Sequence, residues 1–268
     1  MHDTKNINLE AWTKVEKARD KNRPNSLEYI QEIFDSIHEF HGDRAYGEDQ
    51  SVFGGIASLD GISVTIIGIV KGKSVEENIE RNFGMVHPEG YRKALRLMKQ
   101  AEKFKRPIVT FIDTPGAYPG IGAEERGQGH AIATNLYEMM ELSVPSIAII
   151  LGEAGSGGAL ALAVTNQVWM LENSIYSILS PEGFASILYK DVSKAKEIVD
   201  IMKITSHDLK ALGIIDRIIE EGSFEETALN LKRNLIEELT VMRKWKPKKI
   251  KSQRFERFRS MGDIIHEN

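Results

Sequence analysis

The sequence of 268 residues contains no cysteine, which excludes a disulfide framework and a metal site built from thiolates. Zinc would have to bind to the seven histidines, which are scattered along the chain, so we expect no metal in this protein. The sequence also lacks an apolar run of the roughly 20 residues that a membrane-spanning helix needs. Its start, MHDTKNINLE, lacks the basic and apolar pattern of a signal peptide, which favours a cytoplasmic protein without a membrane partner.

A strong overall charge is missing as well. The chain has 35 Lys and Arg residues against 39 Asp and Glu residues, a formal net charge of −4, which argues against a nucleic-acid partner. The exception is the segment 243–268, in which RKWKPKKIKSQRFERFR is locally very basic. Because this charge is confined to one end of the chain, we predict a solvated tail that contacts another subunit.

The N-terminal part of the sequence predicts helices. Residues 9–40 are expected to form two of them, and Asn25 with Glu28 has the spacing of a capping box at the start of the second. We expect these helices to be peripheral and to form an N-terminal helical extension over residues 1–50.

A sheet is expected to begin after this extension. The β-branched runs 51–59 and 62–70 are separated by Asp60-Gly61, a dipeptide typical of a β-hairpin. An amphipathic helix should start at Pro88. Its expected core-facing residues are Tyr91, Ala94, Leu95, Met98, Ala101 and Phe104.

A strand, a glycine-rich loop and a helix then occur twice in tandem. The first copy is PIVTFID, TPGAYPGIG and the helix 124–142, and the second is SIAIIL, GEAGSGG and ALALAV. Continuous apolar runs that alternate with helices indicate parallel strands covered on both faces. The sequence therefore predicts one α/β domain over residues 51–242.

The second glycine loop suggests several kinds of site. A P-loop is excluded because Gly158 and Ala159 stand where Lys and Ser or Thr should bind phosphate and magnesium. A dinucleotide site is only weakly indicated, because Ala154 places a methyl group where pyrophosphate must approach.

Two readings of this loop stay open. A serine hydrolase of crotonase-like or α/β-hydrolase type would use Ser156 as nucleophile, with Asp191 or Asp200 and His207 as partners. Alternatively, the backbone N–H groups of Gly157 and Gly158 would form an oxyanion hole at a helix start and stabilise charge on a carbonyl oxygen.

Three long segments carry a resemblance to a known family. They are the run RNFGMVHPEGYRKALRLMKQAEKFKRPIVTFIDTPGAYPGIGAEERGQ, then GEAGSGGALAL, then YSILSPEGFASILYK. Together they closely resemble the carboxyltransferase α subunits of bacterial acetyl-CoA carboxylase, and the resemblance extends over nearly the whole chain. It implies a crotonase-like (ClpP/crotonase) α/β fold, a spiral of β-β-α units with the helical extension in front.

The resemblance also implies an activity and partners. With a zinc-containing β subunit, in an α2β2 complex, members transfer the carboxyl group from carboxybiotin on the biotin carboxyl carrier protein to acetyl-CoA, giving malonyl-CoA for fatty acid synthesis. Biotin carboxylase completes the full complex. Biotin is thus expected on a partner, not covalently bound to this chain.

Site residues follow from this resemblance and from the loops. The amides of Gly157 and Gly158 are expected to hold the ureido oxyanion of biotin. We expect the substrate-binding residues to be Gly116, Ala117, Tyr118, Pro119, Gly120, Gly155 and Ser156. Lys71 and Lys73, which follow the second strand of the hairpin, are candidates for contact with the phosphates of coenzyme A.

Overall fold

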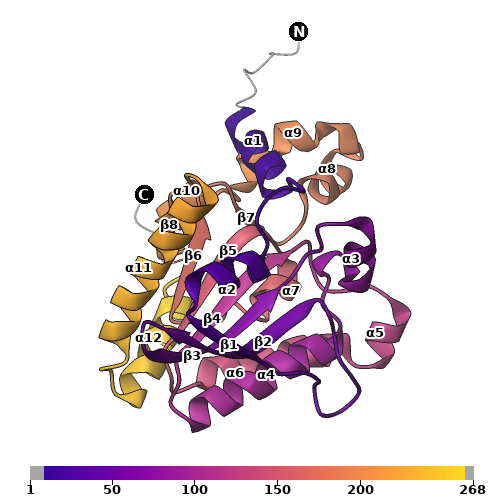
Figure 1. The fold of residues 1–268 in the computed structure, drawn as a ribbon. Coiled ribbons are helices and arrows are strands. Elements are labelled where there is room, and N and C mark those ends of the chain that lie inside the picture. The colour runs from indigo at the N-terminus through magenta and orange to yellow at the C-terminus, as the bar shows by residue number, and fades with distance from the viewer. Residues whose placement is uncertain (1–8, 263–268) are drawn as a thin grey trace.

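The computed structural model describes residues 9–262, which fold around one mixed sheet of eight strands (Figure 1). The strand order is β1-β2-β3-β4-β5-β6-β8, and β7 pairs with the end of β5. The strands are β1 (Ser36–Glu39), β2 (Val52–Leu59), β3 (Ile62–Ile69), β4 (Ile108–Thr114), β5 (Ser146–Gly155), β6 (Gln167–Leu171), β7 (Ile175–Ser177) and β8 (Arg217–Ile219).

Helices connect and cover these strands. They are α1 (Leu9–Ala18), α2 (Ser26–Ile33), α3 (Val75–Glu80), α4 (Pro88–Lys103), α5 (Ile121–Glu125), α6 (Gln128–Glu141), α7 (Ser156–Leu160), α8 (Pro181–Tyr189), α9 (Ala195–Met202), α10 (Ser206–Ala211), α11 (Phe224–Met242) and α12 (Pro247–Arg259), with 3-10 turns at η1 (Asn82–Gly84) and η2 (Val192–Lys194). None of the helices in the range 9–262 combines the length and apolarity needed to span a bilayer.

The hairpin and the parallel strands are confirmed. Strands β2 and β3 are antiparallel and joined by Asp60 and Gly61, which have φ values of 48° and 75°, as the tight turns of two-residue hairpins require. From β3 onward the pairs β3·β4, β4·β5, β5·β6 and β6·β8 are all parallel. Their carboxyl ends therefore lie at one edge of the sheet.

Apolar side chains cover both faces of the sheet. Ile112 of β4 packs in a core with residues of α4 and α6, whereas its neighbour Phe111 packs in a second core with residues of α2 and α11. This alternation is why the strand reads as a continuous apolar run. Smaller cores join α1 to α9 and α8 to α9, and Figure 1 shows these three helices together beyond the carboxyl ends of the strands.

The expected peripheral helices at the N-terminus are partly wrong. The capping box of Asn25 and Glu28 is present, but Tyr29 and Ile30 of α2 are buried in the second core, with Phe111. The second helix also ends at Ile33, because residues 36–39 leave it to form the edge strand β1. The boundary near residue 50 stays a prediction.

Two helix predictions need correction as well. Helix α4 buries Tyr91 and Met98 as expected, but Phe104 is its C-cap and is 58% exposed. The helix expected over 124–142 is divided at Gly127, whose left-handed φ of 82° ends α5 and starts α6.

The prediction of a solvated tail over residues 243–268 is wrong for part of this segment. Residues 247–259 form α12, and Arg254 of this helix is fully buried. Its guanidinium donates to the carbonyl oxygens of Met139 and Leu142 and to the side-chain oxygen of Asn166, at 2.9, 2.7 and 2.7 Å. The basic composition of the segment therefore includes a cation that holds together the end of α6 and the start of β6.

Candidate active site

The two glycine-rich loops meet at the carboxyl ends of the neighbouring strands β4 and β5. A Cβ atom added to Gly158 would lie 2.6 Å from the carbonyl carbon of Gly116 and also too close to the amide nitrogen of Ala117. One added to Gly155 would lie 2.5 Å from the carbonyl carbon of Pro115. Glycine is required at both positions because backbone packs directly on backbone.

Helix α7 starts within the second loop. Gly155 is its N-cap and provides no side-chain cap, and the first N–H groups of a helix have no partner inside it. Ser156 has a left-handed φ of 50°, a backbone conformation that costs a non-glycine residue roughly 1–2 kcal/mol. Ser156 is exposed, Gly157 is half-buried and Gly158 is buried. A strained turn thus precedes the first N–H groups of α7, which have no partner inside the helix.

A large apolar cavity of about 600 Å³ opens beside Ser156 and Gly157. It lies between the main body and the helices α8 and α9. Its other lining residues are Leu160, Tyr176, Ser177, Ile178, Phe184, Ile201, Met202, Lys203, Ile204, Leu209, Leu212 and Ile214. The volume is within the range of small-molecule sites, which combine apolar walls with a few fixed polar groups.

A second cavity of about 260 Å³ adjoins the first and is more polar. Arg19, Glu153 and Gly155 line it, and it shares Ser156 and Ser177 with the apolar cavity. The start of α7 therefore separates an apolar compartment from one that carries charged side chains.

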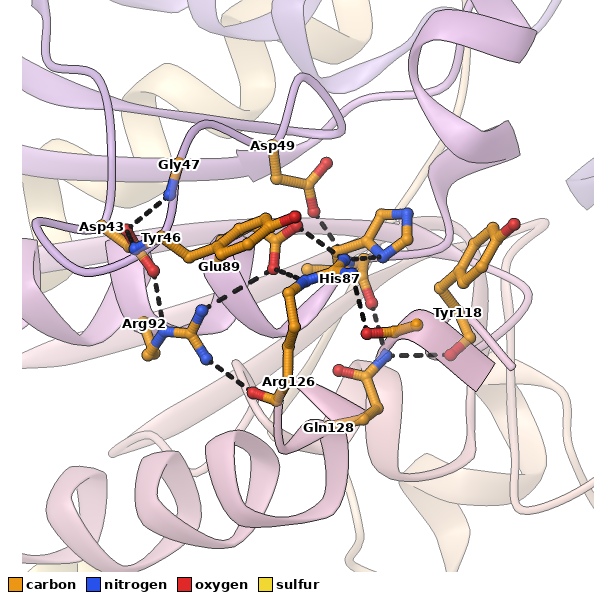
Figure 2. Close-up of polar contacts among 12 residues, drawn as sticks. Asp43, Tyr46, Gly47, Asp49, His87, Glu89, Arg92, Tyr118, Arg126 and Gln128 are labelled. Atoms are coloured by element: carbon orange, nitrogen blue, oxygen red, sulfur yellow. Dashed lines mark hydrogen bonds and ion pairs between the residues drawn. The ribbon is translucent and has the colours of Figure 1, made fainter. Parts of the chain in front are cut away.

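The loop after β4 is held by a polar network, drawn in Figure 2. The side-chain amide of Gln128 donates to the carbonyl oxygens of Val86 and Tyr118, at 2.8 and 3.0 Å, and the Tyr118 N–H donates to Val86 at 3.1 Å. The His87 ring stacks on the Tyr118 ring with centroids 4.1 Å apart. The loop that faces Gly158 is thus fixed to the start of α4.

Arg126 extends this network (Figure 2). Its guanidinium pairs with Glu89 at 2.9 Å, lies 3.1 Å from Nδ1 of His87 and stacks over the Tyr46 ring at 4.6 Å. Gln128, which is 3% exposed, could not be recognised from the sequence, because an amide after a glycine has no motif of its own.

The lysine candidates are engaged within the protein. Lys71 is half-buried and lies 2.8 Å from Asp113 and 3.1 Å from Glu153, and Lys73 lies 2.7 Å from Glu28. Burial alone lowers the pKa of Lys71, but the charges of Asp113 and Glu153 outweigh it and the pKa is raised. Contact of these lysines with coenzyme A phosphates stays a prediction.

The partners of a serine hydrolase are not assembled. Nδ1 of His207 lies 2.8 Å from Nζ of Lys14 and 3.4 Å from the hydroxyl of Ser206, and Asp191 accepts hydrogen bonds from Ser193. None of these contacts involves Ser156. Between residues 9 and 262, no group of three or more His, Asp or Glu side chains is placed to hold a metal ion.

Comparison with known sequences gives consistent matches. The family described as acetyl co-enzyme A carboxylase carboxyltransferase-like matches residues 2–262. The acetyl-coenzyme A carboxylase carboxyl transferase subunit alpha of Clostridium perfringens is 58% identical over 262 residues, 96% of this chain and 97% of the relative. That of Streptococcus gordonii is 60% identical over 247 residues, 91% of this chain and 96% of the relative.

One relative carries the beta and alpha subunits in a single chain. The Clostridium tetani protein named acetyl-coenzyme A carboxylase carboxyl transferase subunits beta/alpha is 56% identical over 262 residues, which cover 95% of this chain but 45% of the relative.

Solved structures share the fold at low sequence identity. A transcarboxylase 12S structure with methylmalonyl-coenzyme A and methylmalonic acid bound has a TM-score of 0.70 at 21% identity, over 88% of this chain and 44% of the other. A Pseudomonas malonate decarboxylase hetero-tetramer in complex with coenzyme A has a TM-score of 0.69 at 18% identity, over 87% and 94% of the two chains. The crotonase-like α/β fold that the resemblance implied is confirmed.

Proposed function

Because this chain belongs to the acetyl-CoA carboxylase carboxyltransferase α-subunit family, we propose that it is the α half of a carboxyltransferase. Together with a β subunit it transfers the carboxyl group from carboxybiotin, borne by a biotin carboxyl carrier protein, to acetyl-CoA. The product, malonyl-CoA, serves fatty acid synthesis. A Ser156 hydrolase is not favoured, since the contacts of His207 and Asp191 leave Ser156 without partners.

The observation that carries the proposal is the meeting of the two glycine loops at the start of α7, beside the apolar cavity. The amides of Gly157 and Gly158 act as the oxyanion hole for the ureido oxygen of biotin. Removal of one donor of this kind typically costs roughly two to three orders of magnitude in rate, so main-chain groups can supply much of the catalysis.

The cavity fits a group of this shape. Its apolar walls can accept the ring and chain of biotin, and a Cβ atom on Gly157 would have nothing nearer than Ile132, at 3.7 Å, so the loop is not crowded at the Cα of Gly157. Carboxybiotin, when bound, supplies the activated carboxyl group. The chain's own residues orient the ring, exclude water through the apolar walls and hold negative charge on main-chain nitrogen donors.

We propose that the loop Gly116–Gly120 forms the opposite wall of the oxyanion site, beside Gly158, and its residues line neither of the two cavities. Its main chain packs on Gly158, and Gln128 and His87 hold Tyr118 in place. We assign substrate contacts to this loop and to Gly155 and Ser156. Lys71 and Lys73 are weaker candidates, because both already have carboxylate partners.

The fused relative supports a β partner, since this chain covers only 45% of it. We propose an α2β2 complex in which the zinc-containing β subunit binds acetyl-CoA and supplies a second oxyanion hole, for the acetyl enolate. Biotin carboxylase reloads the carrier in the full cytoplasmic assembly.

The test is reconstitution. The chain alone should be inactive, whereas the purified α–β complex should form malonyl-CoA from acetyl-CoA and carboxylated carrier protein, and should decarboxylate malonyl-CoA when free biotin is added. Native mass measurement should show an α2β2 mass. A well-formed complex without turnover in either direction would refute the proposal.

A further inference from the structure

The pairing of β4 with β5 is irregular directly before the two glycine loops. Ile112 pairs with Ile150, but Thr114 pairs with Ala154, so two steps along β4 correspond to four steps along β5. Irregularities of this kind bend a strand and re-aim its residues, often beside active sites. The end of β5 therefore lacks a regular ladder with β4 at this point, and its regular pairing here, from Glu153 to Gly155, is with the short strand β7 on its other side.

An ion cluster around the buried Asp113 occupies the irregularity, with Lys71 and Glu153 half-buried. Oδ1 of Asp113 accepts a hydrogen bond from the Glu153 N–H at 3.0 Å and pairs with Nζ of Lys71 at 2.8 Å. The same ammonium lies 3.1 Å from Oε2 of Glu153. Gly152 lets these groups approach, because a Cβ atom there would lie 2.7 Å from Oδ1 of Asp113. Lys71 thereby connects the carboxyl ends of β3, β4 and β5.

Arg19 holds the other oxygen of the same carboxylate. Its Nε lies 2.6 Å from Oε1 of Glu153, and its Nη1 lies 2.6 Å from Oε1 of Glu182 on α8. Burial alone raises the pKa of Glu153, but Lys71 and Arg19 outweigh it and the pKa is lowered. The carboxylate is therefore ionised at neutral pH and held from both sides.

The carboxylate of Glu153 lies close in sequence and in space to the loop that carries the proposed oxyanion hole. Glu153 precedes Gly155 by two residues, and both line the smaller cavity with Ser156. A buried ion pair is weak evidence for stability, because replacing it by apolar groups of similar volume is often neutral or stabilising. The cluster at the irregular end of β5 can instead act by fixing the position of the backbone there.

We propose that Glu153 is a positioning residue, whose carboxylate, held by Lys71 and Arg19, fixes the end of β5 so that the amides of Gly157 and Gly158 keep their direction toward the biotin oxyanion. The inference rests on the proposed function. It assigns Glu153 no contact with either substrate, so it predicts an effect on the chemical step and not on binding.

The experiment compares Glu153→Gln with the wild type in the reconstituted α–β complex. The isosteric amide keeps one acceptor oxygen but turns an NH2 group toward one of the two cations. We expect kcat to fall about 10- to 100-fold, because displacements near 1 Å at a catalytic group can cost this much. KM for the carrier and for acetyl-CoA should stay within about twofold, the pattern of an interaction realised in the transition state.

Glu28→Gln is the matched control. Glu28 also pairs with a lysine, Lys73, at 2.7 Å, but far from α7 in sequence, and glutamine can keep its capping-box role. It should leave kcat unchanged. If Glu153→Gln does not assemble with the β subunit, Arg19→Gln takes its place, because it removes only the outer cation and should still lower kcat at least about fivefold.

The outcomes separate the two proposals. An inactive wild-type complex refutes the proposed function itself. An active wild type with unchanged kcat in Glu153→Gln, or in Arg19→Gln where that variant replaces it, overturns the positioning role. A rise in KM alone also overturns it, since that would place the carboxylate in contact with a substrate.

Discussion

Replacing Gly158 by alanine should damage catalysis through backbone packing. The added methyl group would lie 2.6 Å from the carbonyl carbon of Gly116 and would also meet the amide nitrogen of Ala117. Main-chain atoms cannot rotate away as a side chain can, so the two loops must separate. Overpacking of this kind typically costs about 1–3 kcal/mol of stability. The separation moves the amide that we assign to the oxyanion hole.

The effect on activity should exceed the effect on stability. Loss of one oxyanion donor corresponds to roughly 10²- to 10³-fold in kcat, so a Gly158→Ala complex should make malonyl-CoA at 1% of the wild-type rate or less, an order-of-magnitude estimate. Urea unfolding of the α chain measures stability, and steady-state assays of the α–β complex separate kcat from KM.

Gly129→Ala is the control for this prediction. Gly129 lies in α6, and a Cβ atom there would have no neighbour within 4 Å. The change should keep activity and raise stability slightly, by up to about 1 kcal/mol, because alanine favours a helix more than glycine does. A folded Gly158→Ala complex with wild-type kcat would refute the reasoning from loop contact.

Three further changes test other parts of the structure. Arg254→Leu should lower the free energy of unfolding in urea by roughly 2–4 kcal/mol, because it removes the guanidinium that donates to the carbonyl oxygens of Met139 and Leu142 and to the side-chain oxygen of Asn166, whereas exposed Lys248→Gln should not. Gln128→Ala should free the Tyr118 loop and lower activity more than stability, as parallel kinetic and urea measurements would show; a stability loss alone would contradict this. The lowered pKa of Glu153 means that its ionised form stabilises the fold above the unfolded pKa of about 4.3, and this contribution is lost as pH falls through the folded pKa. The difference in unfolding free energy between wild type and Glu153→Gln should therefore stay nearly constant from pH 7 to about pH 5 and shrink as pH falls below about 4.3, and a difference that stays constant down to about pH 3 would count against the assignment.

The order of the elements could be predicted because local sequence determines it. The hairpin turn predicted at Asp60-Gly61 requires positive φ at both residues, and both have positive φ in the structure. The runs PIVTFID and SIAIIL have no polar face, which requires a sheet covered on both sides. The two glycine loops follow these strands, so their meeting at one edge follows from the parallel order.

The contacts between distant segments could not be predicted in this way. Arg254 looks like one more cation in a basic tail, and its burial depends on carbonyl groups more than 100 residues earlier. Asp113 and Glu153 end two apolar runs, but only the irregular pairing of β4 and β5 brings them to the same ammonium. The number of charged residues in a segment does not show which distant groups they pair with.

The charges around α7 bear on why main-chain amides carry the proposed reaction. Three cations lie close to the site: Arg19 and Lys71 pair with carboxylates of the ion cluster, and Lys203, which lines the apolar cavity, lies 3.6 Å from Asp208. A free cation would attract the carboxyl group of the bound substrate as strongly as the developing oxyanion, and such uniform binding does not accelerate the chemical step. Neutral N–H donors aimed at the oxygen on which charge appears favour the transition state selectively. The ion cluster then contributes by holding these donors in place while its cations stay paired with carboxylates.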